Sequence, residues 1–121
     1  MKYMLLIYLA ENAMSEDERA HCYVESAQLA QHLHATGKFL ATAPLQPVAL
    51  TTSIQMREGK RLVTDGPYAE TREQLGGFFL IDAKDLDEAI GIAAQIPGAR
   101  VGTVEIRPVI ELEGLPKQQS K

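Results

Sequence analysis

A short loop in the middle of the sequence carries the first group of residues that could do chemistry. Asp65-Gly66-Pro67 has the composition of a tight turn, and Tyr68 and Glu70 follow it closely. Loops on a rigid scaffold often carry functional groups. Asp65 is therefore a candidate catalytic residue, and Tyr68 and Glu70 are candidate ligand-binding residues. The alternative is that the Asp65 carboxylate only accepts hydrogen bonds from backbone amides of its own turn.

A carboxylate and a guanidinium form a second candidate group near the C-terminus. Residues 102–111 (GTVEIRPVIE) alternate in polarity, which places Glu105 and Arg107 on the opposite face of a strand from Val104 and Ile106. If the apolar residues face the helices, Arg107 could bind a substrate carboxylate or phosphate on the other side. The alternatives are a salt bridge between subunits and simple exposure on an edge strand, where charges discourage aggregation.

Metal binding and thiol chemistry receive little support from the residue spacing. Asp17, His21 and Glu25 share one face of a predicted helix, but no second cluster of His or Cys completes a site, so a solvated face explains them. Cys22 has no obvious activating cation and is expected to be an inert thiol. Phosphate-binding loops, dinucleotide fingerprints and Cys-x-x-Cys pairs are absent, so we predict no metal and no cofactor.

These candidate residues are positioned by strands and helices that alternate along the chain. The strands over 2–9 and 76–82 are apolar on both faces, which is typical of central strands. Capping patterns at Ser15 and Asp85, with Glu18 and Glu88 reaching back, begin the two helices. The predicted elements are a strand over 2–9, a helix over 16–36 ended by Gly37, a strand over 38–43, a hairpin of 49–57 and 60–64, a strand over 76–82, a helix over 86–96 and a strand over 102–111.

Each helix is expected to bury one stripe of residues against the sheet, and the stripe of the second helix is small. The inner face of the first helix is predicted to include Ala20, Val24, Ala27, Gln31 and His34, broadened by Tyr23, Ala30 and Leu33. The inner face of the second helix is predicted to include Ala89, Ile90, Ala93 and Ala94.

With the hairpin set aside, the order of elements is that of the α+β ferredoxin-like fold, a split β-α-β pair. Its two helices cover one face of the sheet only. The other face would expose Leu, Ile and Phe side chains, so we expect a second copy of the chain to cover it as a homodimer. The alternative is that the hairpin and the C-terminal tail fold over this face. We expect a single domain over 1–112 and a flexible tail over 113–121.

The stretch from Asp65 to Phe78 (DGPYAETREQLGGF) resembles the signature of the DGPF branch of the YCII-related family, with Tyr68 where that signature usually has Phe. Residues 1–8 and 102–109 are similar to the family's first and last strands. The resemblance implies a dimeric α+β barrel in which two ferredoxin-like sheets pack face to face. It also implies a genomic link with extracytoplasmic-function sigma factors, and it implies no established activity.

The wider family is thought to use a His on the first helix and an Asp in an Asp-Pro pair before the last strand. Matched residue by residue, these positions fall near Ser26 and at Ile96-Pro97, so neither group is present here. The acid–base mechanism implied by the family therefore does not transfer to this chain.

Composition limits the setting in which the protein works. The chain has 121 residues, 45% of them hydrophobic, which is the size of one ordinary domain. Its net charge of −4 argues against nucleic acid and acidic membranes as partners. The first apolar stretch runs into Glu11-Asn12 without a cleavage site, so we expect no signal peptide. A lone cysteine fits a reducing compartment, and we expect a cytoplasmic protein.

We therefore predict a homodimer that binds a small molecule in a pocket at the dimer face. Its walls are expected to be Tyr3, Tyr8, Phe78 and Phe79, with Asp65, Glu70 and Arg107 at the polar end, and Tyr68 on the neighbouring loop. The first alternative is a cofactor-independent enzyme with Asp65 as a general base activated by burial. The second is a regulatory module that binds a protein such as a sigma factor.

Overall fold

The computed structural model describes residues 1–116, and its elements follow the predicted order. A short 3-10 turn takes the place of the first part of the predicted hairpin, and the second helix ends at Ala93, before its predicted end at residue 96. The elements are β1 (Lys2–Leu9), α1 (Glu16–Ala35), β2 (Phe39–Pro44), η1 (Val48–Leu50), β3 (Thr52–Arg57), β4 (Lys60–Asp65), β5 (Gln74–Asp82), α2 (Leu86–Ala93), η2 (Pro97–Arg100) and β6 (Thr103–Pro108).

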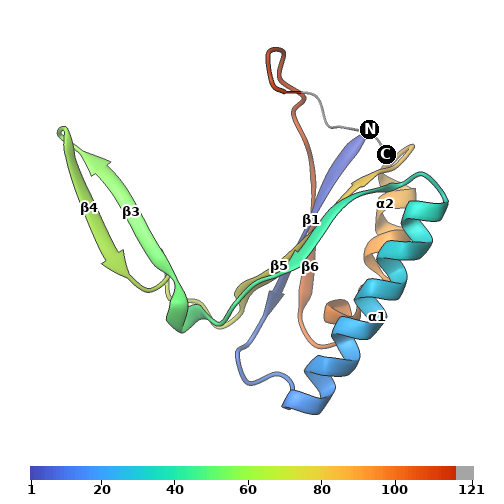
Figure 1. Ribbon diagram of the computed structural model, residues 1–121, viewed down its shortest axis with the longest axis horizontal. Coiled ribbons are helices and arrows are strands. Elements are labelled where there is room, and N and C mark those ends of the chain that lie inside the picture. The colour runs from blue at the N-terminus through green and yellow to red at the C-terminus, as the bar shows by residue number, and fades with distance from the viewer. Residues whose placement is uncertain (117–121) are drawn as a thin grey trace.

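Four antiparallel strands form the main sheet in the order β2-β5-β1-β6, so the two doubly apolar strands are central, as predicted. The order and the two helices make this a ferredoxin-like α+β fold. Both helices lie on one face of the sheet, and the β3–β4 hairpin projects from the other side (Figure 1). The hairpin therefore does not fold over the open face. Of the predicted tail over 113–121, residues 117–121 lie outside the described part of the chain.

The core lies between the sheet and the helices. Tyr3 and Leu5 of β1 and Phe79 and Ile81 of β5 are buried in one cluster with residues of both helices. Because side chains alternate along a strand, Tyr8 and Phe78 belong to the opposite face. The predicted pocket wall that combined Tyr3 and Phe79 with Tyr8 and Phe78 is therefore wrong.

The buried face of α1 agrees with the predicted one only in part. Leu33 is buried and Ala30 half-buried, as predicted, and Leu29 is also buried, with Cys22 and Ser26 half-buried on the same side. Burying the two leucines removes more apolar area from water than burying the predicted stripe, which contains Gln31 and His34. In α2, Ala89 and Ala93 are buried as predicted, whereas Ile92 is buried in place of Ile90 and Ala94 is exposed. The predicted inner residues Ala20, Val24, Ala27, Gln31 and His34 of α1 are all exposed.

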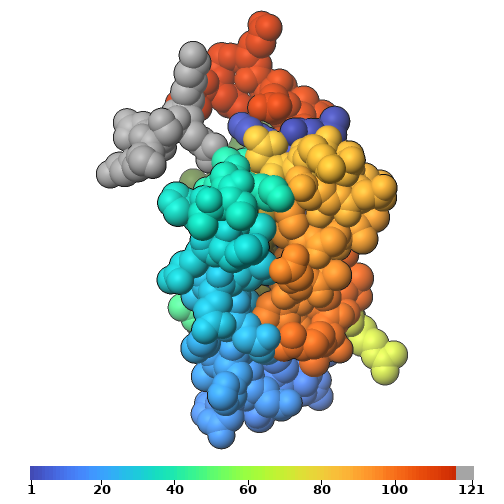
Figure 2. All heavy atoms as spheres, turned by 90° about the vertical axis from the view of Figure 1, so that its right-hand side faces the viewer, coloured from blue at the N-terminus to red at the C-terminus, as the bar shows by residue number. Residues whose placement is uncertain are grey.

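The helix boundaries follow the predicted capping. Ser15 accepts a hydrogen bond from the Glu18 N–H at 3.2 Å, and Glu18 accepts one from the Ser15 N–H at 2.9 Å. Gly37 follows α1 at φ 77°, in the left-handed region that favours glycine. These contacts determine where α1 begins and ends. Figure 2 shows α1 and the segment that carries α2 side by side over the helical face.

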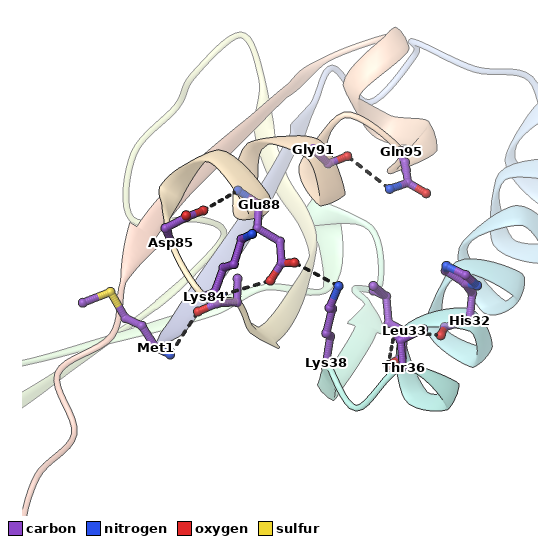
Figure 3. Close-up of polar contacts among 11 residues, drawn as sticks. Met1, His32, Leu33, Thr36, Lys38, Lys84, Asp85, Glu88, Gly91 and Gln95 are labelled. Carbon is purple, nitrogen blue, oxygen red and sulfur yellow. Dashed lines mark hydrogen bonds and ion pairs between the residues drawn. The ribbon is translucent and has the colours of Figure 1, made fainter.

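One end of the two layers is joined by a polar cluster around α2 (Figure 3). Asp85 accepts the Glu88 N–H at 2.9 Å. The Glu88 carboxylate accepts the Lys84 N–H at 2.9 Å instead of reaching the cap residue, and it pairs with Lys38 at 2.9 Å. These bonds connect α2 to the start of β2. The opposite end of the layers, where β1 ends and α1 begins, contains the cavity described next.

Candidate functional site

A partly open apolar cavity of about 180 Å³ lies between the first half of α1 and the sheet. Each layer contributes to its wall, and the side chains come from segments far apart in the sequence. The wall includes Ile7 of β1, Cys22 and Ser26 of α1, Thr42 of β2, Phe79 of β5 and Ile96 before η2.

Small residues explain why the layers leave a space here. Ser26 occupies the α1 face one turn before the buried Leu29, and Gly76 and Gly77 line the cavity from β5. A β-bulge between Ile7 and Tyr8 coincides with this glycine pair. A Cβ on Gly77 would lie 3.1 Å from a β2 carbonyl oxygen, so the two strands meet too closely there for a larger residue. The small size of these residues therefore leaves part of the space between the layers unfilled.

The cavity offers few polar groups, and none of its lining residues is charged. The Thr42 hydroxyl already donates to the Phe78 carbonyl at 2.7 Å. The Cys22 sulfur lies 3.3 Å from the Met14 sulfur, and the Ser26 hydroxyl is half-buried on the same helix face. Such a chamber favours a neutral, mainly apolar guest with one or two hydroxyl-sized polar groups.

A second, more polar hollow of about 300 Å³ adjoins the cavity and shares Leu9, Met14 and Tyr23 with it. Glu11 and Arg19 line this hollow. The Arg19 guanidinium donates to the Glu11 carbonyl at 3.3 Å, and the Glu11 carboxylate accepts the Val48 N–H at 2.8 Å. The charged groups are thus held in the outer hollow by backbone partners, and the inner cavity remains apolar.

Three of the predicted ligand-binding residues meet on the open face of the sheet. Phe78 lies opposite Leu6 across β1, and Tyr8 shares this face with Glu105 and Arg107 of the edge strand β6. Burial raises the pKa of Tyr8, and the charge of Glu105 and a hydrogen bond to it raise it further, while Arg107 acts in the opposite direction. The sequence correctly placed these polar groups on the face away from the helices.

The remaining predicted residues lie elsewhere. Asp65 ends β4 and is exposed, so the burial expected to activate it is wrong. Its turn is held by the Gly66 N–H, which donates to the Thr51 carbonyl at 2.8 Å. Glu70 is exposed on the following loop, and Tyr68 is 85% exposed beside a hollow at the base of the hairpin. Asp65 belongs to the separate β3–β4 sheet, whereas Tyr8 and Arg107 belong to the main sheet, so one copy of the chain divides the predicted polar end between two sheets.

Of the three polar residues that share one face of α1 (Asp17, His21 and Glu25), Glu25 contacts another element. Glu25 forms a two-pronged ion pair with Arg100 of η2, at 2.8 and 3.2 Å. This hydrogen-bonded partner holds the pKa of Glu25 below its ordinary value. Across residues 1–116, no group of three or more His, Cys, Asp or Glu side chains could hold a metal ion. Within the same residues, neither helix is long and apolar enough to cross a membrane.

The cavity walls were missed as functional residues by reasoning from residue types, because Ser26 and Ile96 carry no reactive group. A signal was present, since the positions at which the YCII-related family is thought to carry its His and its Asp fall near Ser26 and at Ile96. The structure places both of them in the wall of one cavity.

The fold and the cavity define a ferredoxin-like α+β protein with a small chamber beneath its first helix. The family model of the YCII-related domain matches residues 1–113, and the chain belongs to this family. An uncharacterized protein of Rhizobium meliloti (strain 1021) is 37% identical, over 90% of this chain and 92% of the relative.

A solved structure shares the fold at low sequence identity. It is 5-chloro-2-hydroxyhydroquinone dehydrochlorinase (TftG) from Burkholderia phenoliruptrix AC1100, in complex with 2,5-dihydroxybenzoquinone. It superposes with a TM-score of 0.57 at 13% identity, over 93% of this chain and 97% of that one. This likeness extends to the fold and no further.

Proposed function

We propose that this protein binds a small, uncharged, single-ring molecule in the cavity between α1 and the sheet. The observation that carries the proposal is a chamber of about 180 Å³ without a charged side chain in its wall. An apolar cavity of about 150 Å³ is large enough for benzene. An ionised guest would lose its hydration there without gaining a partner, which is strongly unfavourable. The guest is therefore neutral.

The few polar groups of the wall give such a guest an orientation. The Ser26 hydroxyl and the Cys22 thiol face the chamber from adjacent turns of α1, and the Thr42 oxygen can still accept a hydrogen bond. A phenol or hydroquinone would place its ring against Phe79 and Ile96 and its hydroxyl near Ser26. TftG is described with a single-ring quinone bound, which is consistent with a guest of this size. The hydroxyls of that quinone are acidic, so we expect neutral hydroquinone to bind this chain more tightly.

Isothermal titration of the purified protein with phenol and with hydroquinone tests the proposal. Ser26→Leu adds a side chain that fills the chamber, and we expect it to weaken binding by at least about tenfold. Gln28→Leu makes a similar change at an exposed position of the same helix, and we expect it to leave binding unchanged. Equal binding by the two variants, or no binding of either compound by the unaltered protein, would contradict the proposal.

A homodimer formed through the open sheet face belongs to the same proposal. Met4, Leu6, Phe78 and Leu80 lie on that face and are only half-buried in one copy of the chain. A second copy related by a two-fold axis covers this surface with the same surface. The stretch from Asp65 to Phe78 supports assignment of the chain to the DGPF branch, and this resemblance implies a dimeric barrel. We also propose that residues 1–112 form a single domain.

A second candidate site lies at the polar edge of that open face. Its support is the group formed by Tyr8, its hydrogen-bond partner Glu105, and the nearby positive charge of Arg107, on the same face as Phe78. A carboxylate ligand would pair with the Arg107 guanidinium. Arg107→Ala is then expected to remove binding of small carboxylates while the dimer remains, and dissociation of the dimer would show a structural role instead.

Two further alternatives stay predictions. An enzyme that uses Asp65 would show turnover that is lost in Asp65→Asn. A regulatory module would co-purify with a sigma factor without needing a small ligand. The cytoplasmic location expected from the single cysteine also stays a prediction, and separation of cell fractions followed by immunoblotting would test it.

A further inference from the structure

The β3–β4 hairpin stands apart from the rest of the described chain. Its strands pair with one another over Thr52–Arg57 and Lys60–Asp65 and form a sheet of their own. Figure 1 shows it projecting on the side of the main sheet away from α1 and α2. A two-stranded hairpin without a packing partner is only marginally stable in water. We therefore expect this hairpin to be stabilised by packing against another protein surface.

One face of the hairpin carries three of its four large apolar side chains, together with Arg61 opposite Met56. Ile54 lies opposite Val63, and Met56 follows Ile54 on the same face because side chains alternate. All three side chains are 59% exposed. The other face carries Ser53, Gln55 and Thr64, with Leu62 as its one large apolar side chain. An uneven distribution of this kind is typical of a hairpin that buries its more apolar face, and the described part of this copy does not bury it.

The tip of the hairpin is well formed and basic. Glu58 and Gly59 have φ values of 49° and 75°, as a two-residue turn between twisted strands requires. Arg57, Lys60 and Arg61 outnumber Glu58 at this tip, whereas the whole chain has a net charge of −4. A second copy of the chain therefore presents an acidic body to a basic tip, which favours their association.

We propose that the β3–β4 hairpin is an arm that packs its Ile54, Met56 and Val63 face against a second copy of this chain. The inference rests on the homodimer proposed above. The arm and the open sheet face lie on the same side of the molecule (Figure 1), so a copy seated on the sheet comes within reach of the arm. Under a two-fold axis the contact occurs twice, once with the arm of each copy.

Sedimentation equilibrium of matched variants tests this arm. Ile54→Asp places a charge on the apolar face, and Thr64→Asp places the same charge on the opposite, exposed face. We expect Ile54→Asp to weaken dimerisation by at least about tenfold and Thr64→Asp to leave it unchanged. If both variants change the dimerisation constant equally, or if neither changes it, the proposed role of the arm is overturned, whereas the proposed homodimer still stands. A monomeric unaltered protein overturns both proposals.

A cross-linking experiment on the full chain makes the result independent of any effect of Ile54→Asp on hairpin folding. The photoreactive residue p-benzoylphenylalanine replaces Ile54, and light and heavy isotope-labelled chains are mixed before illumination. Cross-links that join light to heavy chains support the proposal. Cross-links found only within single chains would show that the hairpin packs on its own copy, which overturns it.

Discussion

Tyr8 shows how a single residue on the open face takes its properties from its neighbours. It is half-buried on β1, and it has Glu105 and Arg107 beside it on β6. Burial and then Glu105 raise its pKa above the ordinary value of 10.0. The folded protein therefore holds the phenolic proton more tightly than the unfolded chain does. Stability is lost as the pH rises above about 10, through the folded-state pKa of Tyr8.

Replacing the carboxylate of Glu105 tests whether this residue raises the pKa of Tyr8. Glu105→Gln removes the charge that disfavours the tyrosinate, so we expect the pKa of Tyr8 to fall toward its ordinary value. NMR titration of ring-labelled tyrosine, with Tyr8→Phe to identify the signal, measures the change. Glu58→Gln, at the tip of the hairpin, is the control and should leave the pKa of Tyr8 unaltered. A pKa that stays unchanged or rises in Glu105→Gln would show that Glu105 does not act on Tyr8.

At the scale of elements, the start of α1 positions Cys22 and Ser26 over the cavity. The helix begins at Glu16 because Ser15 and Glu18 satisfy one another's backbone N–H groups. The Glu25–Arg100 ion pair then connects α1 to η2 beside the same chamber. Both partners are well exposed, so the pair is expected to contribute little to stability.

Removal of the cap measures how much it contributes. We expect Ser15→Ala to lower the free energy of unfolding by about 1 kcal/mol, because one backbone donor of the first turn loses its partner. Ser15→Asp keeps an acceptor at the same position and should retain nearly all of the stability. Urea denaturation followed by circular dichroism gives both values. Equal losses in the two variants would mean that the serine hydroxyl does not act as a cap.

At the scale of the whole molecule, the sequence predicts the fold well and the site only in part. Capping residues and Gly37 are local signals, and the doubly apolar strands over 2–9 and 76–82 can only be central, so order and topology follow. The burial of Leu29 and Leu33 depends on how α1 crosses the sheet, which no local pattern contains. The cavity forms where the side chains between the layers are small. The sequence does not show this empty space, because the segments around it are far apart in the chain.

The positions of Asp65 and Glu70 also depend on tertiary structure that local sequence patterns do not predict. The alternation of β6 predicts the face on which Glu105 and Arg107 lie, whereas the nearness of Tyr8 to them follows from the register of β1 with β6. Asp65 and Glu70 were joined to them only by the expectation that a loop reaches the mouth of a pocket. The projection of the hairpin is set by η1 and the turns at its base. Their geometry depends on tertiary contacts, so Asp65 is exposed where burial was expected.

The most direct test of the ligand chamber is a crystal structure of the protein pressurised with xenon. Xenon enters apolar cavities that are empty of water. We predict a single strong xenon site bounded by Ser26, Phe79 and Ile96, and its loss in Ser26→Leu. Ordered water molecules filling that volume, or side chains collapsed into it, would contradict the account of a chamber built for a neutral ring.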